Sequence, residues 1–87
     1  MLSYEDCLAL SELTEEEVEA IAEHEHIPEM AALEMGRYMI ESPDGQRRIK
    51  RMIADDIQHA KATGNVHKAA TLKLVLKHYC ETHPASV

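Results

Sequence analysis

The stretch that decides the fold is DDIQHAKATGNVHKAATLKLVLKHYCE, residues 55–81. Its apolar side chains recur every three or four residues on both sides of Gly64 and Asn65, which is the period of an amphipathic helix. Glycine commonly follows the end of a helix, and asparagine commonly caps the start of one. Because so few residues join the two segments, they must fold back on each other. The stretch therefore predicts an antiparallel hairpin of two helices.

This hairpin resembles a single tetratricopeptide-like unit. The likeness rests on an alanine in the first helix, the turn glycine Gly64, and the paired alanines Ala69 and Ala70. No second copy follows at a fixed period, so the chain is not expected to be a repeat protein. The resemblance implies a way of packing two helices and no particular activity.

Three more helices are expected before the hairpin. Ser3 and Thr14 are each followed by an acid three residues later, which is a capping-box pattern, and Pro28 suits the first turn of a third helix. That third segment is apolar on nearly every side, which predicts that it is the central helix. The fold class is therefore all-α, a compact single domain over residues 1–87 with a frayed tail at Ala85–Val87. The expected helices cover about 3–10, 14–26, 28–41, 46–62 and 65–82.

The composition predicts a thin core. The chain has 87 residues, no Trp, no Phe and three Tyr, so Ala, Leu, Ile and Met must fill the interior. Small domains with thin cores often gain stability by association. A homodimer is therefore the expected state.

Several features predict a cytoplasmic protein that does not enter a membrane. No apolar run approaches the roughly 18 residues that a membrane span needs. The first residues turn acidic at once, unlike the basic start of a signal peptide. Cys7 and Cys80 are too few and too far apart in sequence to form a disulfide framework, so we expect reduced thiols.

Charge is divided unevenly along the chain. Residues 1–45 carry thirteen acids and one base, whereas residues 46–87 carry eight bases and three acids. The net charge of -7 hides this asymmetry. The two halves are expected to attract each other, within one chain or across a dimer.

Acids and histidines occupy positions where the helical pattern calls for hydrocarbon. Glu25 and Asp56 fall within apolar stripes, His26 and His59 lie beside them, and Glu29 shares a side with apolar residues of the third helix. Such conflicts concentrate at functional sites, but structural hydrogen bonds and ion pairs also produce them. The structural interpretation is favoured, with no cofactor.

The alternative interpretation is a metal site. Glu23-x-x-His26 and Asp56-x-x-His59 both place a carboxylate and an imidazole three residues apart, so that they project from one side of a helix. Ferritin-like di-iron proteins use such pairs with additional glutamates in a bundle core. The metal would be iron, manganese or zinc. The candidate ligands are Glu23, Glu25, His26, Glu29, Asp56 and His59.

A basic cluster opens the fourth expected helix. Arg47, Arg48, Lys50 and Arg51 lie where the helix dipole disfavours cations, so an acidic group should offset them. The internal candidate is the acidic face of the second helix, formed by Glu15, Glu16, Glu19 and Glu23. The external candidate, nucleic acid, is less favoured because half of the chain is strongly acidic and no aromatic residues accompany the cluster.

Leu74 marks a second apolar edge on the last helix. It points away from the main stripe and has Ala70 and His78 beside it, which makes this face the candidate for a dimer or partner contact. No phosphate loop or nucleophile motif is present in the sequence. The sequence therefore favours a small non-enzymatic interaction or regulatory module that self-associates and binds a protein partner, with metal binding and nucleic-acid binding as alternatives.

Overall fold

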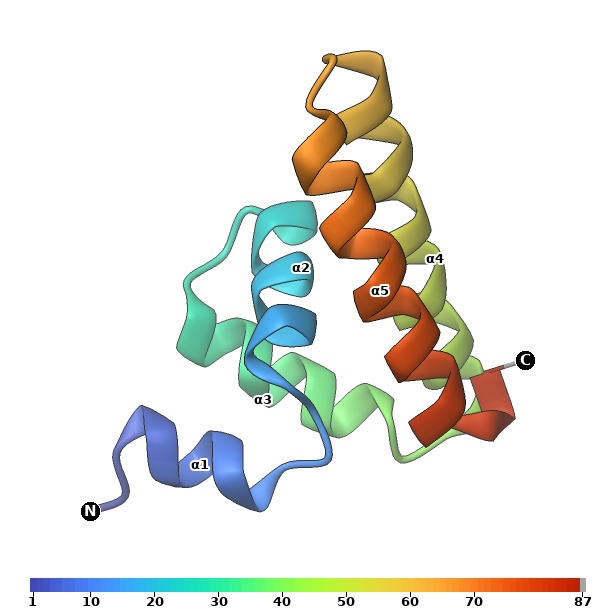
Figure 1. Ribbon diagram of the computed structural model, residues 1–87. Coiled ribbons are helices and arrows are strands. Elements are labelled where there is room, and N and C mark those ends of the chain that lie inside the picture. Colours follow the sequence, from blue (N-terminus) through green and yellow to red (C-terminus); the bar gives the residue numbers. More distant parts are fainter. Residues whose placement is uncertain (87) are drawn as a thin grey trace.

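The computed structural model describes residues 1–86 and is all-α across them, which confirms the predicted fold class (Figure 1). None of the helices in this range has the length and apolar character needed to cross a bilayer. The elements are α1 (Tyr4–Leu10), α2 (Glu15–Glu25), α3 (Glu29–Met39), α4 (Pro43–Ala62), α5 (Val66–Thr82) and a closing 3₁₀ turn, η1 (Pro84–Ser86).

Side-chain caps fix most of the helix starts. Ser3 and Thr14 both form the predicted capping boxes, each with the acid three residues on. The fourth helix begins at Pro43 rather than at about residue 46. Ser42 accepts a hydrogen bond of 3.0 Å from the backbone N–H of Gly45, and Pro43 has the fixed φ that a first helical turn requires. Residues 43–45 therefore form the first turn of α4.

The backbone requires a glycine at each end of α4. Gly64 has φ of +77°, which ends α4 in the left-handed region and lets the chain reverse. At Gly45 a Cβ atom would overlap the carbonyl oxygen of Met39. Gly45 thus allows the first turn of α4 to lie directly against the end of α3.

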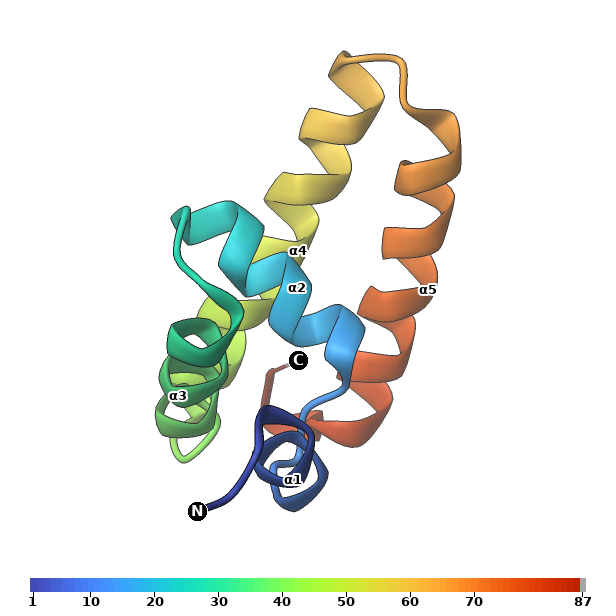
Figure 2. The same cartoon turned by 90° about the vertical axis from the view of Figure 1, so that its left-hand side faces the viewer.

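The hairpin of α4 and α5 is the main framework. The two helices run antiparallel side by side, and α2 lies against both of them and against α3 (Figures 1 and 2). The prediction of a central α3 is wrong, because α4 is the helix that contacts α2, α3, α5 and η1. Although α3 is apolar on nearly every side, only one side of it is covered, and Met30 and Tyr38 are exposed.

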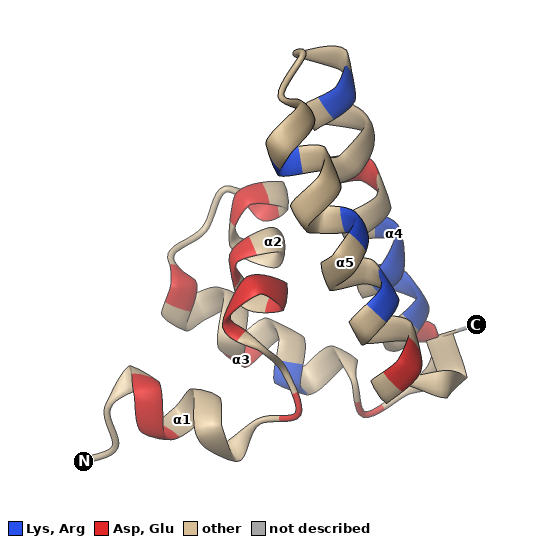
Figure 3. Ribbon diagram, viewed as in Figure 1, with Lys and Arg blue, Asp and Glu red and all other residues tan. Residues whose placement is uncertain are grey.

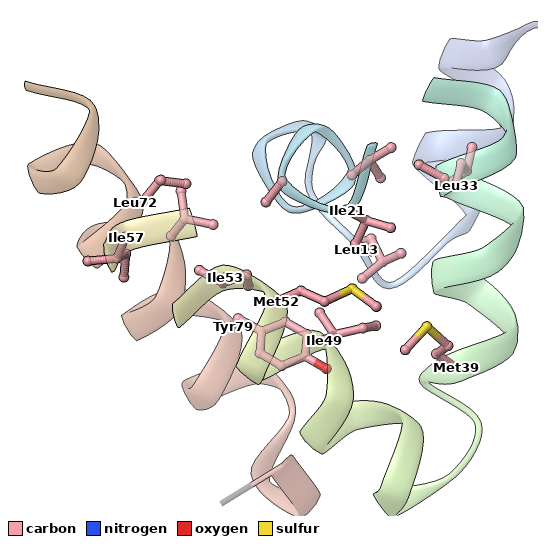
Figure 4. Packing of buried hydrophobic residues seen from close by; sticks show 14 residues of the cluster. Leu13, Ile21, Leu33, Met39, Ile49, Met52, Ile53, Ile57, Leu72 and Tyr79 are labelled. Carbon is pink, nitrogen blue, oxygen red and sulfur yellow. The ribbon is translucent and has the colours of Figure 1, made fainter. Parts of the chain in front are cut away.

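Side chains from α2, α3, α4 and α5 share one core (Figure 4). Burial is complete or nearly so for Ile21, Leu33, Ile49, Ile53 and Tyr79. Aliphatic side chains and one tyrosine therefore do the work that Phe and Trp do in many domains of this size.

The two ends of the described chain differ in how closely they pack on the bundle. No residue of α1 is buried, and this helix extends to one side of the bundle (Figure 1). At the other end, the expected fraying is wrong for Ala85 and Ser86, because η1 packs on α4 and Ser86 is buried. The remaining residue of that prediction, Val87, lies outside the described residues.

Candidate functional site

A polar pocket of about 270 Å³ opens where the end of α2 meets the middle of α4. The pocket is polar because the apolar stripes through which α2 and α4 pack also carry acids and histidines at this point. It is lined by Glu23, His24, His26, Asp55, Asp56 and His59.

His26 ends α2 in an unusual backbone conformation. Its φ of 56° and ψ of 47° lie in the left-handed region, and it is the one non-glycine residue with positive φ among residues 1–86. Its backbone N–H still bonds to the carbonyl of Ala22. Because the chain must leave the helix before Pro28, this cap turns the backbone and leaves the imidazole at the pocket.

His24 bridges two carboxylates. Its Nδ1 lies 2.9 Å from Oε2 of Glu25, and its Nε2 lies 3.2 Å from Oδ2 of Asp55. The hydrogen bond to Glu25 is the largest cause that raises the pKa of His24; desolvation opposes it, and Asp55 raises it further. The bridge joins α2 to α4 most strongly when the imidazole is protonated.

Of the other carboxylates of the pocket, Glu23 has a partner and Asp56 has none among the described residues. Glu23 forms an ion pair with Lys68 of α5. Asp56 is half-buried, and its Oδ2 atom has no hydrogen-bond partner among the described residues. Burial, and then the negative charge of Glu23, raise the pKa of Asp56, whereas His24 and Lys68 lower it. Asp56 is therefore the least satisfied group of the pocket.

The predicted metal ligands converge only in part. Glu23, His26, Asp56 and His59, the residues of the two spacing motifs, line the same pocket. Glu25 instead bonds to His24, and Glu29 begins α3, where its charge contributes to a raised pKa of Tyr4 after the larger effect of burial. Within residues 1–86, no three His, Cys, Asp or Glu side chains form a group that could hold one metal ion.

The exposed side of α5 carries a second candidate site. Leu74 is 69% exposed, and the neighbouring Ala70 and His78 are exposed as well. A shallow groove of about 250 Å³ runs between this side and the start of α2. Its lining residues are Thr14, Glu16, Thr71, Leu74, Val75 and His78.

The basic cluster does not pair with the acidic face of α2. Arg47 pairs with Asp44 of its own helix, and within the described chain Arg48, Lys50 and Arg51 form no ion pair. Figure 3 shows most of the acids on α1, α2 and α3 and most of the bases on α4 and α5. The predicted internal offset is wrong because the side of α4 that faces the core carries Ile49, Met52 and Ile53, which turns the arginines outward.

The sequence pattern did not predict that Glu17 and His83 are buried. Glu17 is 1% exposed; its Oε1 accepts a 2.9 Å hydrogen bond from the backbone of Thr14, and burial raises its pKa. His83 is 3% exposed and stacks on Tyr79 with ring centroids 4.5 Å apart. The helical period contained the signal, since Glu17 is four residues before Ile21 and His83 four residues after Tyr79.

A scan of protein-family models, a search of curated proteins and a search of solved structures each gave no match to this chain.

Proposed function

We propose that this chain is a non-catalytic protein-interaction module that self-associates through one side of α5. The observation that carries the proposal is the exposure of Leu74, at 69%, in the middle of that side. We call this side the α5 outer face. Its residues are Val66, His67, Ala70, Leu74, His78 and Glu81, all of them exposed.

The α5 outer face has the make-up of a helix contact. Positions 67, 70, 74, 78 and 81 are spaced by three or four residues and so form one continuous strip along the helix. Ala70 is small enough to let a second helix come close, and Leu74 supplies the apolar anchor. Burying one leucine is worth about 2 kcal/mol, and a dimer buries two of them.

Part of the polar pocket between α2 and α4 is taken up by contacts that join the helices. Its best-placed histidine, His24, is already held between Glu25 and Asp55, and Glu23 is held by Lys68. Groups that bond to each other in this way serve to join α2 to α4 and α5.

Sedimentation of the Leu74→Glu variant tests the proposal. We expect the wild-type chain to sediment as a dimer at micromolar concentration and the variant to shift to monomer. Leu10→Glu is the matched control, because Leu10 is 70% exposed but lies on α1, and it should keep the wild-type mass. A wild-type chain that is monomeric at all concentrations, or an unchanged mass for Leu74→Glu, would exclude this function.

Divalent-metal binding is a second candidate, supported by the meeting of Glu23, His26, Asp56 and His59 at one pocket. His26 and His59 would have to turn toward Asp56 to share an ion with it, and both are exposed. Elemental analysis of chelator-free protein, and melting curves with added Zn²⁺, Mn²⁺ or Fe²⁺, test it. A metal that raises Tm for the wild type but not for His59→Ala supports this function; no bound metal and no rise in Tm exclude it.

A further inference from the structure

The two edges of the α5 outer face carry opposite charge. On one edge lie Thr71 and Val75, and there the groove brings in Glu16 from the start of α2. On the other edge lie Lys73 and Lys77. At about 100° per residue, these two positions fall on one side of Leu74 around the helix, and Thr71 and Val75 fall on the other. Figure 3 shows the acids of α2 and the bases of α5 on these neighbouring helices.

None of these charged groups is already paired. Glu16, Lys73 and Lys77 are all exposed, and none of them takes part in an ion pair within the described chain. Each edge can therefore pair with an oppositely charged surface without breaking an existing contact.

Symmetry decides which edges meet when two copies pair through this face. If the two-fold axis runs perpendicular to α5, the helices are antiparallel and each edge meets the same edge of the other copy, acid against acid and base against base. If the axis runs parallel to α5, the helices point the same way and each edge meets the opposite edge. The two edges are complementary in charge only in the second arrangement, in which Glu81, at one end of the strip, is the one acid of the face that meets its own copy.

We infer that two copies of this chain pair about a two-fold axis parallel to α5, with Leu74 packed on Leu74 of the partner subunit and Glu16 facing Lys73 and Lys77 of the partner subunit. This inference rests on the proposed function, since it specifies the partner and the orientation of the same face. The symmetry forms the charged contact twice, once on each side of the leucine pair.

The required contact area also involves α2. A stable interface usually covers about 800 Å² of each partner, which is roughly a seventh of this chain's accessible surface of 5474 Å². One strip of a 17-residue helix is too narrow for that, so the contact must extend across the groove to the start of α2. The arrangement with the parallel axis brings Glu16 into the interface in this way.

Charge reversal tests the pairing. Glu16→Lys, and separately Lys73→Glu with Lys77→Glu, should each weaken the dimer about tenfold in sedimentation, since attraction becomes repulsion at two symmetric places. The triple variant should restore the wild-type dissociation constant. Circular dichroism shows whether each variant keeps the wild-type helix content, which these exposed positions should permit. Single reversals that leave the dimer unchanged, or a triple variant no tighter than the weaker partial variant, overturn the inference.

Cross-linking tests the orientation independently of charge. In a background with Cys7→Ser and Cys80→Ser, the Ala70→Cys variant should link to itself through a short bifunctional thiol reagent, because the parallel helices hold position 70 level in both copies. The His78→Cys variant should do the same. In the antiparallel arrangement, two copies of position 70 lie about 12 Å apart along the helix axis, and only a mixture of the two variants links.

The two experiments separate the inference from the proposed function. A dimer that links only in the mixture overturns the parallel axis and leaves self-association through α5 intact. A wild-type chain that stays monomeric and links in no variant overturns both.

Discussion

The hydroxyl of Tyr79 donates a hydrogen bond of 2.8 Å to the backbone carbonyl of Gln46. The two residues lie 33 positions apart, Tyr79 near the end of α5 and Gln46 in the first turns of α4. Tyr79 has no exposed surface, and burial is the main cause that raises its pKa. The bond therefore closes the open end of the hairpin, at the far end from the turn at Gly64.

We expect Tyr79→Phe to reduce the free energy of unfolding by about 1 kcal/mol, the usual value of a neutral hydrogen bond. The ring would still fill the core, so the loss comes from the hydroxyl and from the carbonyl left without it. In a domain of this length, that corresponds to a fall in Tm of about 4–8 °C. Thermal and urea unfolding measure it, and Tyr38→Phe is the control, because Tyr38 is 78% exposed. Equal stability of Tyr79→Phe and wild type would show that this bond does not stabilise the fold.

Glu17 has two effects of opposite sign. Its carboxylate caps α2 by accepting the N–H of Thr14, yet burial of the charge raises its pKa. Glutamine can cap in the same way without the charge, so Glu17→Gln should be more stable than wild type at pH 7. Glu17→Ala loses the cap and should be less stable by about 1 kcal/mol. Urea unfolding of the pair separates the two effects, and a Glu17→Gln variant as unstable as Glu17→Ala would show that the buried charge itself is required.

The helices were predictable because their signals are local. Ser3 and Thr14 act as caps as the sequence indicated, and Gly64 forms the hairpin turn. The start of α4 differed from the predicted one because Ser42 and Pro43 suit a turn and a helix start equally well. The close approach of Gly45 to Met39 is a tertiary contact, which the local sequence does not show. Such tertiary contacts decide where a helix begins and ends more than they decide whether it forms.

The arrangement of the helices and the partners of charged groups were less predictable. Apolar residues on nearly every side of α3 suggested that it is the central helix. Such a helix can also lie at the surface with one side uncovered, and the spacing of its apolar residues is the same in both cases. Likewise the sequence offered the acidic face of α2 as the internal partner of the arginines of α4, although the core stripe of α4 turns them away. The sequence placed Asp56, His59 and His26 on or beside apolar stripes and left open whether they converge; in the structure they line one pocket.

Asp56 should make the fold less stable as pH rises. Burial raises its pKa above the ordinary aspartate value of about 3.8, so the folded state holds its proton more tightly than the unfolded state does. The free energy of unfolding should therefore fall as pH rises from about 4 through the raised pKa. Asp56→Leu and Asp56→Asn should both stabilise the protein at pH 7 and reduce this fall, and only Asp56→Leu adds apolar burial. Urea unfolding at several pH values measures both, and a large loss of stability in Asp56→Leu would mean that the carboxylate has a partner the fold depends on.

His24 should act in the same direction as Asp56, with stability falling as pH rises, but near the histidine pKa instead of the aspartate pKa. Its pKa is raised by the hydrogen bond to Glu25 and, after the opposing desolvation, by Asp55, so the folded state binds its proton more tightly than the unfolded state does. The stabilisation is complete below the ordinary histidine pKa of about 6.5 and is lost as pH rises through the raised value. His24→Gln should therefore be less stable than wild type at pH 6 and should approach it by pH 9. His59→Gln is the control, because His59 is exposed and has no carboxylate within hydrogen-bond distance among the described residues. If His24→Gln shows the same difference from wild type at both pH values, the protonated bridge does not join α2 to α4.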